Sequence, residues 1–166
     1  MSELPKRKPP RLKGYDYGQN GAYFITFCTK DKLKTLGRVV GRDAPGAPLV
    51  ELTGLGEAVR KEIGETHTHY DGVVVDKFVV MPNHVHLIVL INSDGGMPGA
   101  SRPMNTLIPR IVAMIKKKTN RAFGSDTWQH SFHDHIIRDE AEYLRIWQYI
   151  DDNPALWIED GYFVAD

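Results

Sequence analysis

Two neighbouring apolar segments dominate the pattern of hydrophobic and polar positions along the chain. Residues 73–80 and 84–91 are rich in valine, isoleucine and leucine, and a short Met-Pro-Asn stretch separates them. Apolar runs of this length on either side of a turn predict two strands with a tight connection. Residues 22–29 combine aromatic and β-branched side chains and predict another strand, and residues 131–137 predict a last one.

Helical periodicity appears between and after these strands. Thr53 is a suitable N-cap for a helix that runs to about Thr66. A second helix is predicted over 105–121, where apolar residues recur four apart and the proline lies in the first turn. Asp139 caps a last helix with a glutamate three residues on, and a proline ends it just past Asn153.

The order of these elements predicts the fold class. Strand, helix, strand, strand, helix, strand is the order of a ferredoxin-like α+β fold, an antiparallel sheet with helices on one face. The last helix is an addition to it. Residues 37–40 and 48–52 flank a Gly/Pro-rich connector and predict a peripheral hairpin. We expect a basic, flexible N-terminal arm over 1–21 and one domain over 22–166.

Composition places the chain among single globular domains. It has 166 residues, of which 42% are hydrophobic and 25% are charged. Because no run approaches ~18 apolar residues, a membrane span is excluded. The basic start has no apolar stretch behind it, so no export signal is visible. A single cysteine, Cys28, cannot form an internal disulfide. We therefore expect a cytoplasmic protein, associated with the nucleoid if it acts on bacterial DNA.

Charge is balanced overall but unevenly distributed. Twenty-one basic residues face 21 acidic ones, which argues against a globally basic nucleic-acid binder. Basic residues gather in the first thirteen positions and again at Arg110, Lys116, Lys117, Lys118 and Arg121. Such clusters can contact a polyanion locally. For the lysine run alone, a solvated helix end is the favoured interpretation.

His84 and His86 are the first candidates for chemistry. Side chains alternate along a strand, so both imidazoles point to the same face, where they can bind a divalent metal from one side. The alternative is a pair of hydrogen-bonded or half-exposed histidines. The same spacing occurs at residues 67/69 and 133/135, so the pattern alone is weak evidence.

The last helix carries a second candidate group. Its apolar stripe faces the core, whereas Tyr149 lies off that stripe, four residues before Asn153. A phenol beside an amide oxygen can meet a metal on the strand if the helix crosses the sheet there. A nearby cation would lower the pKa of the phenol, ordinarily ~10. A surface tyrosine near a helix end is an equally good interpretation of the spacing alone.

Taken together, the motifs resemble those of a known family. VVMPNHVHLI at 79–88 looks like the HUH strand of single-tyrosine transposases, and is most similar to that of the REP-associated tyrosine transposases. YFITFCTKD at 23–31, WQHSFHDHIIRDE at 128–140 and YIDDNPALWIED at 149–160 also resemble family segments. The resemblance covers roughly residues 22 to 163.

This resemblance implies a mechanism and a set of site residues. His84, His86 and Asn153 would bind Mg²⁺ or Mn²⁺, and Tyr149 would be the nucleophile that attacks single-stranded DNA. The products would be a 5′-phosphotyrosine link and a free 3′-hydroxyl that can rejoin. Family members recognise imperfect DNA hairpins. The roles of the two aspartates between Tyr149 and Asn153 stay open.

DNA contacts are expected from the basic residues. Arg110, the three lysines at 116–118 and Arg121 are candidates for backbone contacts, and Arg138 is a candidate phosphate ligand. Two other functions remain open, a non-catalytic hairpin-binding protein and a metal-dependent phosphodiesterase that uses water. The chain would act as a monomer, or as a homodimer that exchanges its tyrosine helices.

Overall fold

A computed structural model describes residues 21–41, 48–92 and 107–165. The predicted N-terminal arm lies outside the described residues except for Gly21, and so do most of the connector after residue 40 and of the loop after residue 91.

The centre of the fold is a four-stranded antiparallel sheet. Its strands lie in the order β4 (Val73–Val80), β5 (His84–Ile91), β1 (Gly21–Cys28) and β6 (His133–Ile137). One helix separates β1 from β4 in sequence and another separates β5 from β6. Along the chain the four strands come in the order β1, β4, β5, β6, and the first and third of them, β1 and β5, lie in the middle of the sheet. This is the predicted ferredoxin-like topology.

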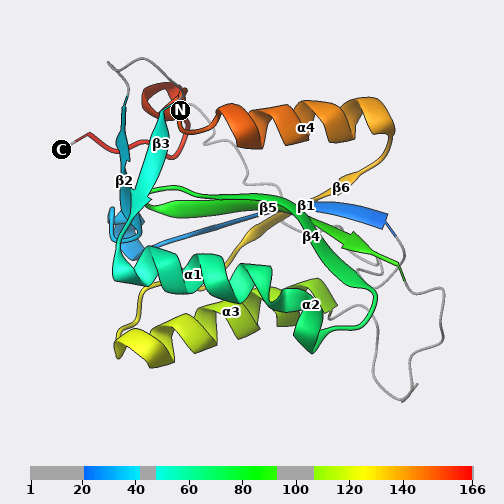
Figure 1. Ribbon diagram of the computed structural model, residues 1–166, viewed down its shortest axis with the longest axis horizontal. Coiled ribbons are helices and arrows are strands. Elements are labelled where there is room, and N and C mark those ends of the chain that lie inside the picture. The colour runs from blue at the N-terminus through cyan, green and yellow to red at the C-terminus, as the bar shows by residue number, and fades with distance from the viewer. Residues whose placement is uncertain (1–20, 42–47, 93–106, 166) are drawn as a thin grey trace, which may run out of the picture.

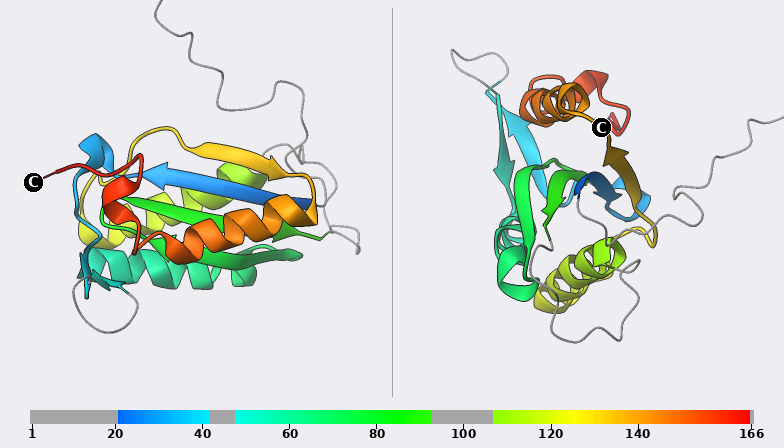
Figure 2. Two further views of the ribbon diagram at one scale, coloured as in Figure 1. Left: turned by 90° about the horizontal axis from the view of Figure 1, so that it is seen from above. Right: turned by 90° about the vertical axis from the view of Figure 1, so that its right-hand side faces the viewer.

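Helices cover both faces of the sheet, which makes three layers (Figures 1 and 2). The helices α1 (Gly54–Gly64), α2 (Thr66–His69) and α3 (Leu107–Phe123) lie on one face. The last helix, α4 (Glu140–Asp152), crosses the other face. The predicted caps are present, since Thr53 accepts a hydrogen bond from the backbone of Gly56 and Asp139 accepts one from that of Glu142.

Alternation along the strands divides the core between these two faces. Ile25 and Leu87 are fully buried in the larger cluster beneath α1 and α3, whereas Ile88 packs with Ile150 of α4 in a smaller one. The even-numbered residues of β5 thus face α4. His84 and His86 belong to that even-numbered set.

The remaining elements lie at the end of the sheet where β5 begins. They are the short helix η1 (Lys30–Lys32), the hairpin of β2 (Gly37–Val40) and β3 (Leu49–Leu52), and the short helix η3 (Trp157–Glu159). Hydrogen bonds fasten the β4–β5 turn to this region, since the backbone N–H of Leu36 donates to Pro82 and that of Thr29 to Asn83.

Several elements differ from the sequence prediction. β6 begins at His133 rather than residue 131, because the side chain of Lys116 donates to the carbonyls of Gln129 and Ser131 at 2.7 and 3.0 Å, where a strand partner would otherwise bond. The short helices η1, α2 and η3 were not predicted. Within the described part of the chain, no helix is both long and apolar enough to cross a membrane.

Candidate active site

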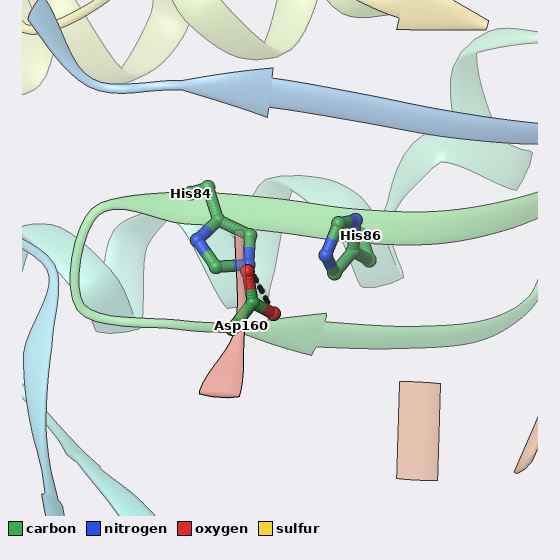
Figure 3. A group of neighbouring side chains, drawn as sticks. All are labelled: His84, His86 and Asp160. Carbon is green, nitrogen blue, oxygen red and sulfur yellow. Dashed lines mark ion pairs between the residues drawn. The ribbon is translucent and has the colours of Figure 1, made fainter. Parts of the chain in front are cut away.

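The two histidines of β5 lie side by side (Figure 3), on the face of the sheet that α4 covers. His84 and His86 are 0% and 1% exposed, and their ring centroids are 4.5 Å apart. Two imidazoles inside an apolar layer need polar partners, because burial without them is costly. Each ring has one such partner on its Nδ1 atom, and each leaves its Nε2 atom on the site side.

The tautomer of His84 is set by the residue before it. Asn83 is fully buried, and its Nδ2 donates to the carbonyls of Tyr162 and Lys32 at 2.8 and 3.2 Å. Its Oδ1 is therefore the acceptor for Nδ1–H of His84, 2.8 Å away. The lone pair of His84 is left on Nε2, as a metal-binding imidazole requires.

His86 is held by neighbours on β1. Its Nδ1 lies 2.7 Å from the hydroxyl oxygen of Thr26. The ring of Phe24 stacks on the imidazole, with centroids 5.3 Å apart and planes 30° apart. The register of the strands makes this possible, because Thr26 is directly opposite His86 in the antiparallel pair.

Helix α4 brings the predicted tyrosine and asparagine to the histidines. The hydroxyl oxygen of Tyr149 lies 3.3 Å from Nε2 of His86, and Tyr149 keeps 39% of its surface exposed. Asn153, the C-cap of α4, is 1% exposed. The helix is fastened to β4 where Lys77 pairs with Asp151 at 2.5 Å.

Asp160, which was not predicted as a site residue, completes the group. Its Oδ2 accepts hydrogen bonds from Nδ2 of Asn153 at 2.8 Å and from the hydroxyl of Tyr149 at 3.3 Å. The same oxygen is 3.9 Å from Nε2 of His84 (Figure 3). Asp160 is the last residue of the motif that begins at Tyr149, so the sequence held a signal for it.

The residues present fit a divalent cation. His84, His86 and Asp160 each offer one ligand atom, and these atoms lie within 4.8 Å of one another. Nε2 of His84 and Oδ1 of Asn153 are buried and have no hydrogen-bond partner among the described residues. Buried polar atoms are normally satisfied, and a cation would satisfy both. Imidazole nitrogens with carboxylate and amide oxygens are suitable ligands.

Burial controls the protonation of these groups. It lowers the pKa of His84 to about 4, although the charge of Asp160 and the nearby side chain of Asn153 partly oppose it. Burial also lowers the pKa of His86 well below its ordinary value, and the charge of His84 adds to this. Burial, followed by the charge of Asp160, raises the pKa of Tyr149 to about 12. At neutral pH the site thus holds neutral imidazoles and a protonated phenol.

A pocket of about 430 Å³ adjoins the site. Its lining includes Trp157, Pro82, Lys34 and Arg38, with no acidic residue. Trp157 connects it to the histidines, since its ring centroid is 5.8 Å from that of His84.

The predicted DNA-binding residues lie away from this site. Arg110, Lys116, Lys117, Lys118 and Arg121 are on α3, on the opposite face of the sheet from α4. Arg138 is exposed at the far end of α4 from Tyr149, where its backbone N–H donates to Glu142. Lys118 pairs with Glu62 at 2.9 Å.

Comparisons with known proteins agree with the predicted resemblance. An uncharacterized protein of Haemophilus influenzae is 32% identical over 176 residues, covering 95% of this chain and 93% of its own. A second protein of that organism, provisionally named a REP-associated tyrosine transposase, is 24% identical, covering 89% of this chain and 76% of its own. No protein-family model matches the chain.

A solved structure shares the fold. It is that of a REP-associated tyrosine transposase bound to a REP hairpin, with a TM-score of 0.61 and 22% identity over 92% of this chain and 75% of the other. The motifs and this shared fold point the same way. The resemblance of the chain to the REP-associated tyrosine transposases is therefore confirmed, in sequence by the second relative and in fold by the solved structure.

Proposed function

We propose that this protein is a metal-dependent transposase that cuts and rejoins single-stranded DNA through Tyr149. The observation that carries the proposal is the convergence of Tyr149, His86 and Asp160, with the phenol oxygen 3.3 Å from both neighbours. A tyrosine placed on a buried histidine pair and a carboxylate fits nucleophilic attack beside a cation site better than it fits a surface role.

His84, His86, Asp160 and the side-chain oxygen of Asn153 would hold the cation, Mg²⁺ or Mn²⁺. When bound, the cation would act as a Lewis acid on the scissile phosphate and favour the phenolate. The protein residues supply orientation. Asp160 holds both Tyr149 and Asn153, and Asn83 and Thr26 hold the two imidazoles.

The covalent step balances with groups in this site. Oη of Tyr149 bonds to the phosphorus while the bond from phosphorus to the 3′ oxygen breaks, which leaves a 5′-phosphotyrosine and a free 3′-hydroxyl. The phenol proton has an acceptor in place, because Tyr149 already donates to Oδ2 of Asp160. The departing 3′ oxygen takes up a proton in turn, from the protonated carboxyl of Asp160 or from water. The reverse attack by a 3′-hydroxyl restores the phosphodiester, so joining needs no external energy source.

We propose hairpin DNA with unpaired flanks as the substrate, because the solved neighbour was bound to a REP hairpin. The basic residues of α3 and Arg138 would contact the DNA backbone at a distance from the tyrosine. The predicted basic arm over 1–21 would add contacts of the same kind. In this proposal the chain acts on DNA with its own tyrosine helix, since α4 is fastened to the sheet of the same chain.

Covalent trapping tests this function. The protein is mixed with labelled REP-type hairpin DNA bearing unpaired flanks, with Mn²⁺ or with EDTA, and separated on a denaturing gel. We expect a Mn²⁺-dependent adduct that Tyr149→Phe abolishes. Tyr70→Phe is the matched control, because it removes the same kind of hydroxyl at a place away from the site. The hydroxyl of Tyr70 donates to the carbonyl of Arg110 on α3.

Two results would replace the proposal with another function. Cleavage without an adduct, retained in Tyr149→Phe, would indicate a phosphodiesterase that uses water. A gel shift of the hairpin with neither cleavage nor adduct would indicate a hairpin-binding protein that keeps the site without using it.

A further inference from the structure

Two adjacent residues next to the site have an unusual backbone conformation. Asp31 and Lys32 have φ angles of 54° and 53°, and they are the only non-glycine residues with positive φ among those described. Left-handed backbone is unfavourable for residues with a Cβ atom, and two in succession are rarer still. Such strain gathers where a side chain must be placed for function.

The neighbouring turn holds this conformation in place. Nδ2 of Asn83 donates to the backbone oxygen of Lys32 at 3.2 Å, and Oδ1 of the same side chain accepts from His84. The hydroxyl of Thr29 closes the segment by donating to the carbonyl of Leu33 at 2.7 Å. One buried amide therefore connects the backbone of Lys32 to the orientation of a metal-site histidine.

The strained segment directs the ammonium of Lys32 toward the site. Its Nζ lies 5.6 Å from the ring centroid of Tyr162. That ring packs against both imidazoles, with centroids 4.6 Å from His84 and 5.6 Å from His86. The charge is thus one aromatic ring away from the histidines, on the face of the sheet that carries Tyr149.

This ammonium has no carboxylate partner within the described residues, in contrast to three other lysines. Lys30 pairs with Asp126, Lys77 with Asp151 and Lys118 with Glu62. A contact between an ammonium and an aromatic ring is favourable, but it leaves the three donors of the ammonium free to bind an anion. A phosphodiester is the anion that fits a tyrosine nucleophile.

We propose that Lys32 binds the phosphodiester that enters the site of Tyr149, an inference that rests on the proposed function. The negative charge near the tyrosine favours such a cation. Asp160 contacts the phenol, and of the two aspartates that follow Tyr149 on α4, Asp151 is paired with Lys77 whereas Asp152 has no cationic partner among the described residues. These carboxylates repel a phosphate that approaches the tyrosine, and the positive charge of Lys32 counteracts the repulsion. Lys34 and Arg38, which follow in the same segment, line the adjoining pocket, and the charge of Arg38 is paired with Glu51.

Binding of unpaired DNA in EDTA tests the role of Lys32 apart from any reaction. A labelled single-stranded oligonucleotide is titrated with the protein at several salt concentrations. We expect Lys32→Gln to weaken binding roughly tenfold at low salt and to reduce the slope of log K against log salt by about 0.7. Lys32→Arg keeps the charge and should restore both. Lys61→Gln, an exposed residue of α1 on the other face, is the control and should change neither.

Covalent trapping with hairpin DNA and Mn²⁺ then separates the two proposals. An unchanged affinity and salt slope in Lys32→Gln, while the wild-type protein binds DNA and forms the adduct, would overturn the role of Lys32 alone. If Lys32→Gln reduces the salt slope but the wild-type protein forms no adduct, the proposed reaction is overturned and Lys32 remains a DNA contact. A wild-type protein that binds no DNA would overturn both. Circular dichroism of Lys32→Gln confirms that the variant is folded.

Discussion

The side-chain amide of Asn153 donates a hydrogen bond of 2.8 Å to Oδ2 of Asp160, and this bond fixes which way the amide faces. With Nδ2 bonded to the carboxylate, Oδ1 is left without a partner among the described residues. The same carboxylate accepts from Tyr149. One acidic side chain therefore orders both residues that α4 contributes to the site.

Asp160→Asn should weaken metal binding. The neutral amide can neither attract a cation as the carboxylate does nor hold Asn153 in one orientation. Loss of a partner that orients ligands typically costs roughly 10- to 100-fold in metal affinity. Titration of Mn²⁺, followed by the electron paramagnetic resonance signal of the free ion, measures the change. Glu159→Gln removes an exposed charge next to Asp160 and is the control. Equal affinities in the two variants would exclude this role of Asp160.

The metal-free protein should lose stability as the pH falls from 6.5 toward 4. Burial lowers the pKa of His84 to about 4 and that of His86 in the same direction. In this window the unfolded chain binds protons that the folded chain does not, so the free energy of unfolding decreases with falling pH. Urea unfolding in EDTA at several pH values measures the slope. His84→Gln should flatten it, and an unchanged slope would show that His84 charges readily in the folded state.

Much of the fold was predictable because local signals and tertiary structure agree. The apolar runs that predicted strands over 73–80 and 84–91 match β4 and β5 in their bounds, although only β5 lies in the interior of the sheet and β4 is at its edge. Asp139 caps α4 as its sequence spacing indicates. The alternation of β5 placed His84 and His86 on one face, and that is where they are.

Three features depend on contacts that no local pattern contains. Asp160 reaches the site only because the chain turns back through η3 after α4. The conformation of Lys32 depends on Asn83, which is far from it in sequence. Lys116 belongs to a basic run that looks solvated, yet its ammonium fastens α3 to the segment before β6. Each arises from packing between distant segments rather than from propensity.

Lys77→Met should loosen the tyrosine helix. The ammonium lies 3.7 Å from the ring centroid of Trp147 and 2.5 Å from an oxygen of Asp151, so it fastens α4 to β4 by two contacts. Together the two contacts should contribute about 1 kcal/mol to the free energy of unfolding, because the ion pair is partly exposed. Urea unfolding measures this loss, with Lys61→Met as the exposed control. Adduct formation should fall more than hairpin affinity, since Tyr149 is on the helix that loosens. An equal fall in both would mean that Lys77 acts on DNA binding instead.

Neighbouring lysines of α3 should differ in what they do. Lys116 donates to the carbonyls of Gln129 and Ser131, and burial lowers its pKa to about 8, so at pH 7 it is still protonated and both bonds form. Lys116→Met should cost about 1–2 kcal/mol of unfolding free energy. Lys117 is exposed, and its side chain makes no hydrogen bond or ion pair within the described residues. Lys117→Met should change stability by less than about 0.5 kcal/mol.

The effects of the two lysines on hairpin binding should be the reverse of their effects on stability. If the basic residues of α3 contact the DNA backbone, Lys117→Gln should reduce the slope of log K against log salt by about 0.9, the value for one phosphate contact on duplex DNA. Lys116→Gln should leave that slope nearly unchanged in folded protein, because its ammonium is already engaged by two carbonyls. Binding measured at several salt concentrations tests both variants. A slope that falls for Lys116 and not for Lys117 would mean that the DNA displaces these carbonyls and that the segment before β6 moves on binding.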